Sequence, residues 1–484
     1  MEEKDKEQNK ILTDSLQENM TYLNQALDVE KNFDIIYRVV HIGGKEACMY
    51  LIDGFCKDDL DQKLLQYFMD LTPDKMPEDM HEMSKQFTPY VEVDIEGKWD
   101  ALTTSLLSGV FVLLIDGYDK ALLIDSRTYP SRGVTEPEKD KSLRGSKDGF
   151  VETLVSNTAL IRRRIRSTDL HIEMMNAGET SRTDIALCYM KGRVDDVFLD
   201  EIRRKISDIK VDSLTMNQES LAECLYQRKW YNPFPKFKYT ERPDAAAAQV
   251  LEGNIVIFVD NSPSAMILPT TIFDVIEEAD DYYFPPVTGT YLRMTRFLIS
   301  LLTYLVTPTF LLMMNNPGWI PESFSFIMLQ EEPNLPLIWQ FLVLELAIDG
   351  LKLAAINTPN MLSTPLSVMA ALVLGEFSVN SGWFSSEVML YMAFVAIANY
   401  TQSNYELGYA LKFLRIITLL LTQWFGLWGY LGGILLSLFA MGCNRTVSHR
   451  SYLYPLIPFD WKALKSKLFR TRLPGALNED AGQH

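Results

Sequence analysis

The pattern of apolar and polar positions divides the chain into two parts. Up to about residue 285, short apolar runs bounded by turn residues predict strands. They alternate with segments whose apolar residues recur every three to four positions, which predicts helices. From residue 297 to residue 442, long apolar runs dominate instead. We therefore expect an α+β region in two subdomains, followed by an α-helical transmembrane domain.

Two hairpins are predicted early in the α+β region, one turning at Gly43-Gly44 and one near residues 117–119, because each turn joins two apolar runs. Turn residues and charges cluster at 131–148, where we place the division between the two subdomains. Further helices are predicted at 58–71, 148–166 and 194–209, and further strands at 170–178, 183–192, 254–261 and 264–271.

Five apolar segments are candidate membrane spans, judged against the ~20 residues that one crossing needs. The third and fourth are short, and the fifth is longer than one crossing requires. Within the fifth, Gly429 and Gly433 form a GxxxG motif, which predicts close packing of helices either within one subunit or between subunits. The segments are 297–314, 337–356, 363–380, 388–402 and 407–442.

The charges sharpen this division and suggest a topology. Residues 1–296 carry a net charge of −16, whereas residues 443–484 carry +4. Because basic residues flank the first span and fill the tail, the positive-inside rule predicts that both ends lie in the cytoplasm. That requires an even number among four to six crossings, so one segment is re-entrant or the last one doubles back. The predicted domains are 1–140, 141–290, 291–442 and a basic cytoplasmic tail at 443–484.

The sequence contains no motif for nucleotide binding, hydrolysis or a structural zinc site, and its five cysteines are scattered. We therefore expect reduced thiols, no metal, no cofactor and no enzymatic activity. Asp116 and Asp260 follow predicted strands but have no nearby His or Cys partner, which favours ordinary carboxylates over a catalytic pair. The basic run 160–166 lies in an acidic region, which favours pairing with nearby acids over binding of nucleic acid.

One charged stripe stands out in the second span. Glu345, Asp349 and Lys352 share a helical face, and a charge at the bilayer centre costs roughly 2.5–3.5 kcal/mol unless it is hidden from lipid. In one interpretation the two acids, with Glu376, form carboxylate rings along a cation path, and Lys352 tunes or pairs with them. In the other, the stripe is a buried network that locks helices together.

Three stretches resemble the spore germination receptor A-subunit family, the GerA family. The likeness runs from about residue 110 to residue 472. In the first stretch it implies a structural role for Thr240, Glu241, Arg242, Pro243 and Asp244. The stretches are "YTERPDAAAAQVLEGNIVIFVDNSPSAMILP" (239–269), "RGSKDGFVETLVSNTALIRRRIR" (144–166) and "EEADDYYFPPVTGTYLRMTRFL" (277–298).

The family pattern in the second span resembles E-x-L-R-E-A-G-x-R-x-P. Residues 349–359 occupy the corresponding positions in this chain but follow the pattern only in part. Asp349 and Lys352 keep an acid and a base. The second acid, the glycine and the second base are replaced by Leu353, Ala355 and Asn357. This departure argues against direct coupling to germinants of the ordinary receptor kind.

The resemblance implies a protein of the inner membrane of the bacterial spore that forms a homo-oligomeric ring, with a pentamer as the expected form. It also implies that the ring releases monovalent cations during germination, and that a small partner membrane protein and the germination receptors are partners. A chain with four to six crossings can scarcely enclose a pore alone, whereas a ring of copies can. The alternative is a non-conducting membrane scaffold or regulatory subunit that docks receptors and partner proteins.

Overall fold

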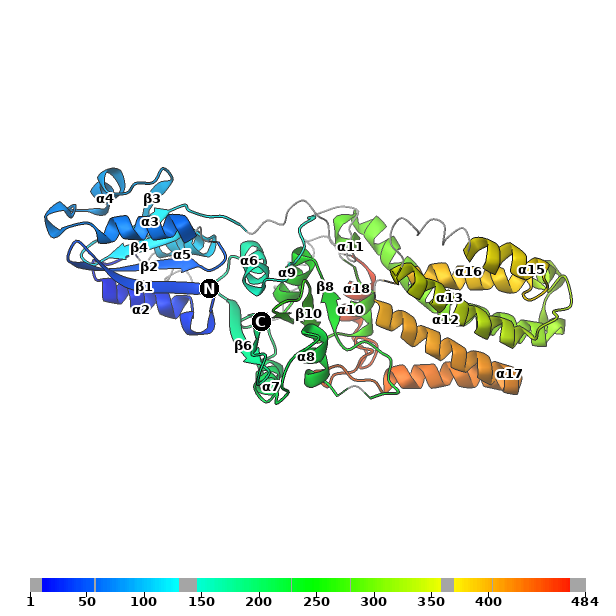
Figure 1. Cartoon of the computed structure of the whole chain (residues 1–484). Helices are drawn as coiled ribbons and strands as arrows, with labels where there is room; N and C mark the ends of the chain where they lie inside the picture. Colours follow the sequence, from blue (N-terminus) through cyan, green and yellow to red (C-terminus); the bar gives the residue numbers. More distant parts are fainter. Residues whose placement is uncertain are drawn as a thin grey trace. The chain divides into compact units, whose positions relative to one another are not determined.

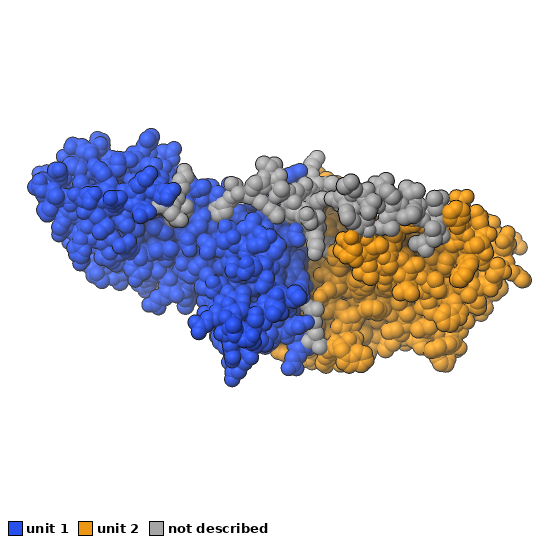
Figure 2. All heavy atoms as spheres, in the orientation of Figure 1, with its two compact units in different colours: residues 1–228, 237–269 blue, residues 229–236, 270–484 orange. Residues whose placement is uncertain are grey.

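The computed structural model describes residues 11–55, 58–129, 146–227, 229–278, 280–357, 370–402 and 404–470. The chain forms two compact units (Figure 2). The first unit comprises residues 1–228 and 237–269, and the second, which we call the helical unit, comprises residues 229–236 and 270–484. The predicted order, an α+β region followed by apolar helices, is confirmed.

The first unit contains two five-stranded antiparallel sheets, with strand orders β1-β2-β4-β5-β3 and β6-β7-β9-β10-β8. Both predicted hairpins are present, and at the first of them Gly43 and Gly44 have φ values of 55° and 79°, which suit glycine. The strands are β1 (Ile35–Ile42), β2 (Lys45–Ile52), β3 (Val93–Glu96), β4 (Phe111–Ile115), β5 (Ala121–Ile124), β6 (Leu170–Ala177), β7 (Thr183–Met190), β8 (Lys238–Thr240), β9 (Ile255–Val259) and β10 (Ala265–Leu268).

Helices cover both faces of the first sheet because successive side chains of a strand point to opposite faces. Tyr50 of β2 belongs to the core formed with α2 and α5, whereas its neighbour Met49 belongs to the core formed with α3 and α4. The helices of this unit are α2 (Leu16–Ala26), α3 (Asp58–Met69), α4 (Met80–Gln86), α5 (Trp99–Leu107), α6 (Leu154–Arg164), α7 (Asp196–Ser207), α8 (Gln218–Leu225) and α9 (Pro243–Leu251), with short 3-10 turns η1 (Val29–Lys31) and η2 (Pro73–Lys75).

The two sheets are built on the same plan. In each, a hairpin is followed along the chain by helices, an edge strand, one more helix and a second hairpin that pairs with the first. The contacts repeat as well. Asp116, after β4, accepts a hydrogen bond from the amide of Leu16 at 3.1 Å, and Asp260, after β9, accepts one from Leu154 at 3.3 Å. The first unit is therefore a tandem pair of one module.

The two aspartates thus lie in different modules, where each accepts from the amide that opens a helix. Replacing Asp116 or Asp260 by alanine is expected to cost a similar amount in each module, about 1 kcal/mol of unfolding free energy, since each loses one helix-capping acceptor. Hydrogen exchange of α2 and of α6 would measure the two effects separately. Faster exchange in both helices after a single substitution would contradict the independence of the two caps.

A buried ion pair joins the modules. Arg162 of α6 donates to both carboxylate oxygens of Asp34 at 2.8 and 3.0 Å, and neither side chain is more than 1% exposed. Arg162 also donates to the side-chain oxygen of Asn32 at 3.2 Å, and that oxygen accepts from the amide of Ile172 in β6. Together with the bond between Arg164 and Asp148 at 2.6 Å, this shows that two arginines of the basic run 160–166 pair with acids of their own chain.

The helical unit contains the long apolar helices. By length and composition, two helices of the described chain could cross a membrane, α12 (Pro286–Asn315) and α17 (Tyr405–Gly442), and α16 (Ser386–Tyr400) is a shorter apolar helix. The remaining elements are α10 (Ile272–Ile276), α11 (Asp280–Tyr283), η3 (Pro317–Trp319), η4 (Glu322–Ile327), α13 (Leu337–Asn357), the π-helical turn η5 (Leu372–Phe377), α15 (Ser378–Asn380) and α18 (Trp461–Leu468).

The helix α17 doubles back at Gly426, whose φ of 56° and ψ of −131° lie outside the helical range (Figure 1). Both arms contact the same hydroxyl group of Tyr304 in α12, through Thr418 at 2.9 Å and Ser437 at 2.8 Å. A Cβ atom on Gly429 would collide with the backbone of the first arm, and one on Gly433 would meet the Thr418 side chain at 2.7 Å. The GxxxG motif therefore packs the two arms of one chain against each other.

Contacts between aromatic side chains show in which direction the helices of the helical unit run. We call the end of the helical unit where α12 begins the base. Phe310, near the other end of α12, contacts Phe341 at the start of α13 and Tyr391 in α16, so both helices run toward the base. The described helices make five passes between the two ends of the helical unit, counting the arms of α17 separately. The second arm of α17 ends at the base, where Arg293 of α12 also contacts α18 of the tail.

Exposed aromatic side chains form a rim at each end of these helices, as they do at the two interfaces of a bilayer. At the base the rim contains Tyr291, Tyr405, Phe459 and Trp461, and at the far end it contains Trp319, Trp339, Trp383, Trp424 and Trp428.

Candidate functional site: a charge network between the helices

The acid at the start of the charged stripe is locked inside the helical unit. Glu345 of α13 is 4% exposed and accepts two hydrogen bonds from Arg415 of α17, one of them at 2.8 Å from Nε. Arg415 is fully buried, and its remaining Nη donates to the backbone carbonyl of Thr303 in α12 at 2.8 Å. One arginine thus ties three helices together, which requires its charge to be paired.

The second acid is paired too, but it lies nearer the surface. Asp349 accepts a hydrogen bond from the ammonium group of Lys412 in α17, and 26% of its side chain is exposed. Lys412 also lies 3.4 Å from the carboxylate of Glu345. Two acids of α13 therefore face two bases of α17, and their formal charges cancel.

Lys352 lies against two aromatic rings, close enough to Asp349 and Glu345 to interact with their charges. Its ammonium group lies 5.2 Å from the ring centre of Tyr400 and 5.7 Å from that of Tyr409, a cation–π arrangement, while Asp349 is held by Lys412. Lys412 and Arg415 stand near the start of the last predicted span, and the sequence alone did not indicate that they pair with the acids of the second span. Their spacing of three positions, facing the four-residue spacing of Glu345 and Asp349, is the signal that could have found the network.

Glu376, the third candidate pore acid, is set apart from this network. It lies on the π-helical turn η5 and is exposed. Within the described part of the chain its carboxylate has neither an ion-pair nor a hydrogen-bond partner. Residues 358 and 359, which end the family pattern of the second span, lie outside the described residues.

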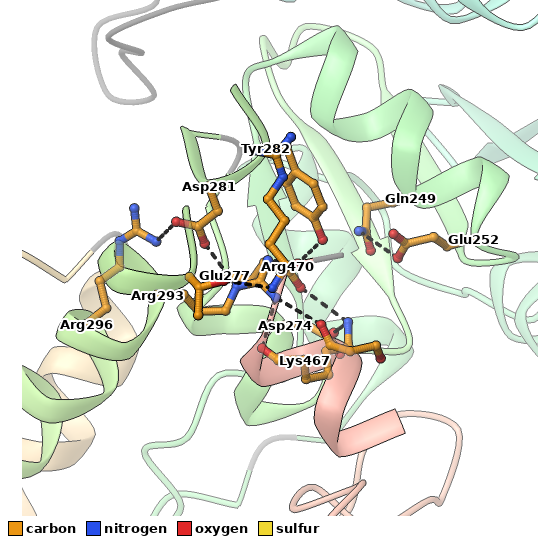
Figure 3. A network of polar contacts seen from close by, with 12 residues as sticks. Gln249, Glu252, Asp274, Glu277, Asp281, Tyr282, Arg293, Arg296, Lys467 and Arg470 are labelled. Carbon is orange, nitrogen blue, oxygen red and sulfur yellow. Dashed lines mark hydrogen bonds and ion pairs between the residues drawn. The ribbon is translucent and has the colours of Figure 1, made fainter. Parts of the chain in front are cut away.

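A second ion network lies at the base of α12 (Figure 3). Arg293 is 1% exposed and donates to Glu277 at 2.8 Å and to Asp281 at 3.3 Å, and Arg296 lies 3.0 Å from Glu278. In the sequence, these two arginines indicated only which side of the membrane the start of the first span faces. In the structure they fasten α12 to α11 and to the acidic segment that precedes it.

The basic tail joins this second network. Arg293 donates to the carbonyl oxygens of Ser466 and Lys467 at 3.1 and 2.9 Å, so it satisfies the open carboxyl end of α18. Lys467 in turn contacts Asp274 at 2.6 Å and Glu277 at 3.3 Å (Figure 3). The tail is therefore fastened at the same end as the start of α12.

The residues 229–236, which we call the strap, interrupt the first unit in sequence and pack in the helical unit. The Lys236 side chain is almost fully buried. Its amine donates to the Asn444 side chain and, at 2.5 Å, to the carbonyl of Arg445, and it lies 5.5 Å from the ring centre of Tyr452. Burial, together with the nearby charge of Lys229, lowers the pKa of Lys236 to about 8.

Docking of the strap is therefore expected to strengthen as pH rises. Below about pH 8 the Lys236 amine is charged in both the docked and the undocked strap, so docking must bury a charged group. Between pH 8 and the ordinary pKa near 10.5, only the amine of the undocked strap keeps its proton. The docked state gains roughly 3 kcal/mol over that interval. Hydrogen exchange of the strap, corrected for intrinsic rates, would measure this gain. The same pH response in Lys236→Met would contradict it.

The family motif at 240–244 has a local role in the first unit. Arg242 is 2% exposed and forms a bidentate pair with Asp244 at 3.1 and 2.6 Å, and its amide donates to the hydroxyl of Thr240. Pro243 occupies the first turn of α9, where its missing amide costs nothing. The carbonyl of Glu241 accepts from the amide of Phe150 at 2.9 Å. The motif thus fixes the start of α9 beside β8.

These features define a class of protein: a membrane protein whose two-module α+β region precedes a helical unit held together by buried ion pairs. The chain belongs to the family described as Bacillus/Clostridium GerA spore germination protein, whose model matches residues 21–480. This confirms the resemblance found in the sequence and assigns the chain a role in germination or sporulation.

Several relatives match over most of their length. Stage V sporulation protein AF of Bacillus subtilis is 36% identical over 95% of this chain and 93% of its own, in keeping with the likeness to that protein expected from residues 281–298. Spore germination protein KA of the same organism is 28% identical over 97% of this chain and 86% of its own. The N-terminal domain of the A subunit of the Bacillus megaterium spore germinant receptor GerK3 matches 54% of this chain and 96% of its own with a TM-score of 0.42 and 29% identity.

Proposed function

We propose that the chain is one subunit of an oligomeric ion channel of the GerA type, which releases monovalent cations and promotes spore germination. The names of its relatives support a role in this process. In the described part of a single chain, Glu345 and Arg415 between the helices are buried and paired with each other, which leaves them unable to line a path for ions. A path for ions would then form between copies, around the axis of a ring, and the proposal assigns no catalytic step to the chain.

The observation that carries the proposal is the exposed carboxylate of Glu376 on a π-helical turn of an apolar segment. A carboxylate facing lipid costs roughly 2.5–3.5 kcal/mol, so a neighbouring subunit or water is the favoured surrounding. Single π-helical turns inside helices frequently mark functional sites. In a ring, one Glu376 from each subunit would make a ring of carboxylates, and the partly exposed Asp349 would lie on the same kind of path.

Replacing Glu376 by glutamine is therefore expected to lower the preference for potassium over chloride while leaving the oligomer intact, because the ring loses one charge per subunit in a passage of low effective dielectric. The reversal potential of reconstituted protein in a potassium chloride gradient would measure the change. The matched control is Glu332→Gln, which removes an exposed charge from the loop between α12 and α13. An equal shift in both variants would assign the effect to surface charge rather than to a pore.

We also propose that the channel lies in the inner membrane of the spore, with the first unit and the tail on the cytoplasmic side. The contact of α18 with the start of α12 supports a common side for both, and the basic tail favours the cytoplasmic one. A small membrane protein and the germination receptors would be its partners.

A second candidate function is a non-conducting scaffold that docks such partners. The observation that favours it is the outer strand β1, which ends the first sheet and exposes Ile36, Tyr37 and Val39 by 40–44%. An exposed apolar edge strand can pair with another chain. For such a scaffold, a charge on this edge, as in Val39→Lys, is expected to abolish partner binding, while neither the wild type nor the variant passes potassium.

A further inference from the structure

The tip of the strap carries the most exposed tryptophan in the described chain. Trp230 is 96% exposed and Tyr231 is 63% exposed, and their rings pack edge to face with centroids 5.9 Å apart. Leaving two large aromatic side chains in water is unfavourable, and such a patch normally marks a contact with another surface. The amphipathic rings of Trp and Tyr favour one surface in particular, the interface between lipid and water.

The strap is fastened where that interface lies. Asn232 donates to the side chain of Asn444 at 3.0 Å, and Lys236 donates to Asn444 and to the carbonyl of Arg445. Both partners follow directly after α17, which ends at Gly442. Two extended residues span at most about 7 Å, so the anchor point of the strap lies within the headgroup layer of the bilayer that α17 leaves.

The tail also exposes aromatic side chains at the base of the helical unit. Phe459 and Trp461 are 67% and 62% exposed, and the exposed Lys465 lies one turn further along α18. The bond from Arg293 to the end of α18 holds this helix about one turn before the apolar part of α12 begins at Phe297. Aromatic rings beside lysines are typical of segments that lie in the interface plane.

We propose that the strap and the tail together form an interfacial anchor. Its exposed aromatic side chains, from Trp230 and Tyr231 in the strap and from Phe459 and Trp461 in the tail, sit in the headgroup layer on the side of the membrane where α12 begins. Lys229 and Lys465 face the phosphates of acidic lipids beside them. The strap lies between two parts of the first unit in sequence, so this contact fastens the loop that leaves and re-enters that unit to the membrane surface.

The test uses the full-length protein in nanodiscs. The fluorescence of Trp230 is taken as the difference between the wild type and Trp230→Phe, in lipids brominated either near the headgroup end or near the methyl end of the acyl chains. The anchor predicts strong quenching by the shallow bromines, weak quenching by the deep ones, and little quenching by iodide in solution. The control is Trp99→Phe, because Trp99 is 5% exposed in the core of the first unit and is expected to respond to neither lipid.

Quenching of Trp230 by iodide and not by bromines would overturn the proposal, since the strap would then lie in water. Protection from both quenchers would also overturn it, because a protein partner would then cover the patch. A second experiment tests the role of Lys229 and Lys465. Replacing phosphatidylglycerol by phosphatidylcholine is expected to reduce quenching by the shallow bromines in the wild type. The same exchange of lipid should change this quenching much less in the double variant Lys229→Gln with Lys465→Gln. An identical response in that double variant would remove acidic lipids from the proposal.

Discussion

Replacing Arg415 by methionine is expected to destabilise the helical unit by about 3–5 kcal/mol, because the buried carboxylate of Glu345 then keeps only Lys412, which lies 3.4 Å away and also pairs with Asp349. The carbonyl of Thr303 loses its hydrogen bond from Arg415 as well. The protein should unfold at a much lower temperature, and the oligomer proposed for it should be lost. Thermal unfolding in mild detergent, together with size-exclusion chromatography, would measure both effects.

Two further variants separate pairing from mere loss of charge. Lys352→Met removes a lysine of the same stripe whose neighbours are two tyrosine rings, so its effect should be small, on the order of 1 kcal/mol. Glu345→Met combined with Arg415→Met removes both partners and should recover much of the stability lost in the single variant. A double variant no more stable than Arg415→Met would contradict the view that the buried acid deprived of Arg415 causes the loss.

In the first unit, Arg162→Met is expected to be about as damaging, again about 3–5 kcal/mol, because Asp34 is 1% exposed and would be left as an unpaired buried charge. The loss should be greatest at the junction of the modules, where Asn32 joins Arg162 to β6. Hydrogen exchange of β1 and β6 in the full-length protein would record it.

The neighbouring residue supplies a matched control. Arg163 is exposed and lies 4.3 Å from the ring centre of Tyr129, so Arg163→Met should cost no more than about 1 kcal/mol. Equal damage from both substitutions would show that net positive charge in this run matters, rather than the pair between Arg162 and Asp34.

The local features of the fold were predictable because local physics sets them. The turn at Gly43-Gly44 needs positive φ values that glycine supplies, and the strands around it need only alternation of apolar residues. The doubling back of the last span was left open as one of two possibilities, since its length showed that one crossing was too few. The bend at Gly426 is the structural answer, and it also explains why Gly429 and Gly433 face the other arm of the same helix.

The pairings between distant segments were not predictable in the same way. The stripe of Glu345 and Asp349 was visible, but its partners Lys412 and Arg415 lie more than sixty positions away and could be assigned only once α13 and α17 were placed side by side. The strap was missed for a related reason. Lys236 and Asn232 resemble ordinary loop residues in the sequence, and only the structure places Asn444 and Arg445 beside them. The doubled module was missed because equivalent contacts, such as those of Asp116 and Asp260, join residues far apart in sequence.

The most direct test of the proposed channel is potassium flux through the purified wild-type protein in liposomes, with the oligomeric mass measured on the same preparation. The proposal predicts a closed oligomer that passes potassium in preference to chloride, and a loss of that preference in Glu376→Gln at unchanged mass. A correctly assembled oligomer that passes no potassium, alone or with its membrane partners added, would contradict the channel and leave the scaffold as the function of this chain.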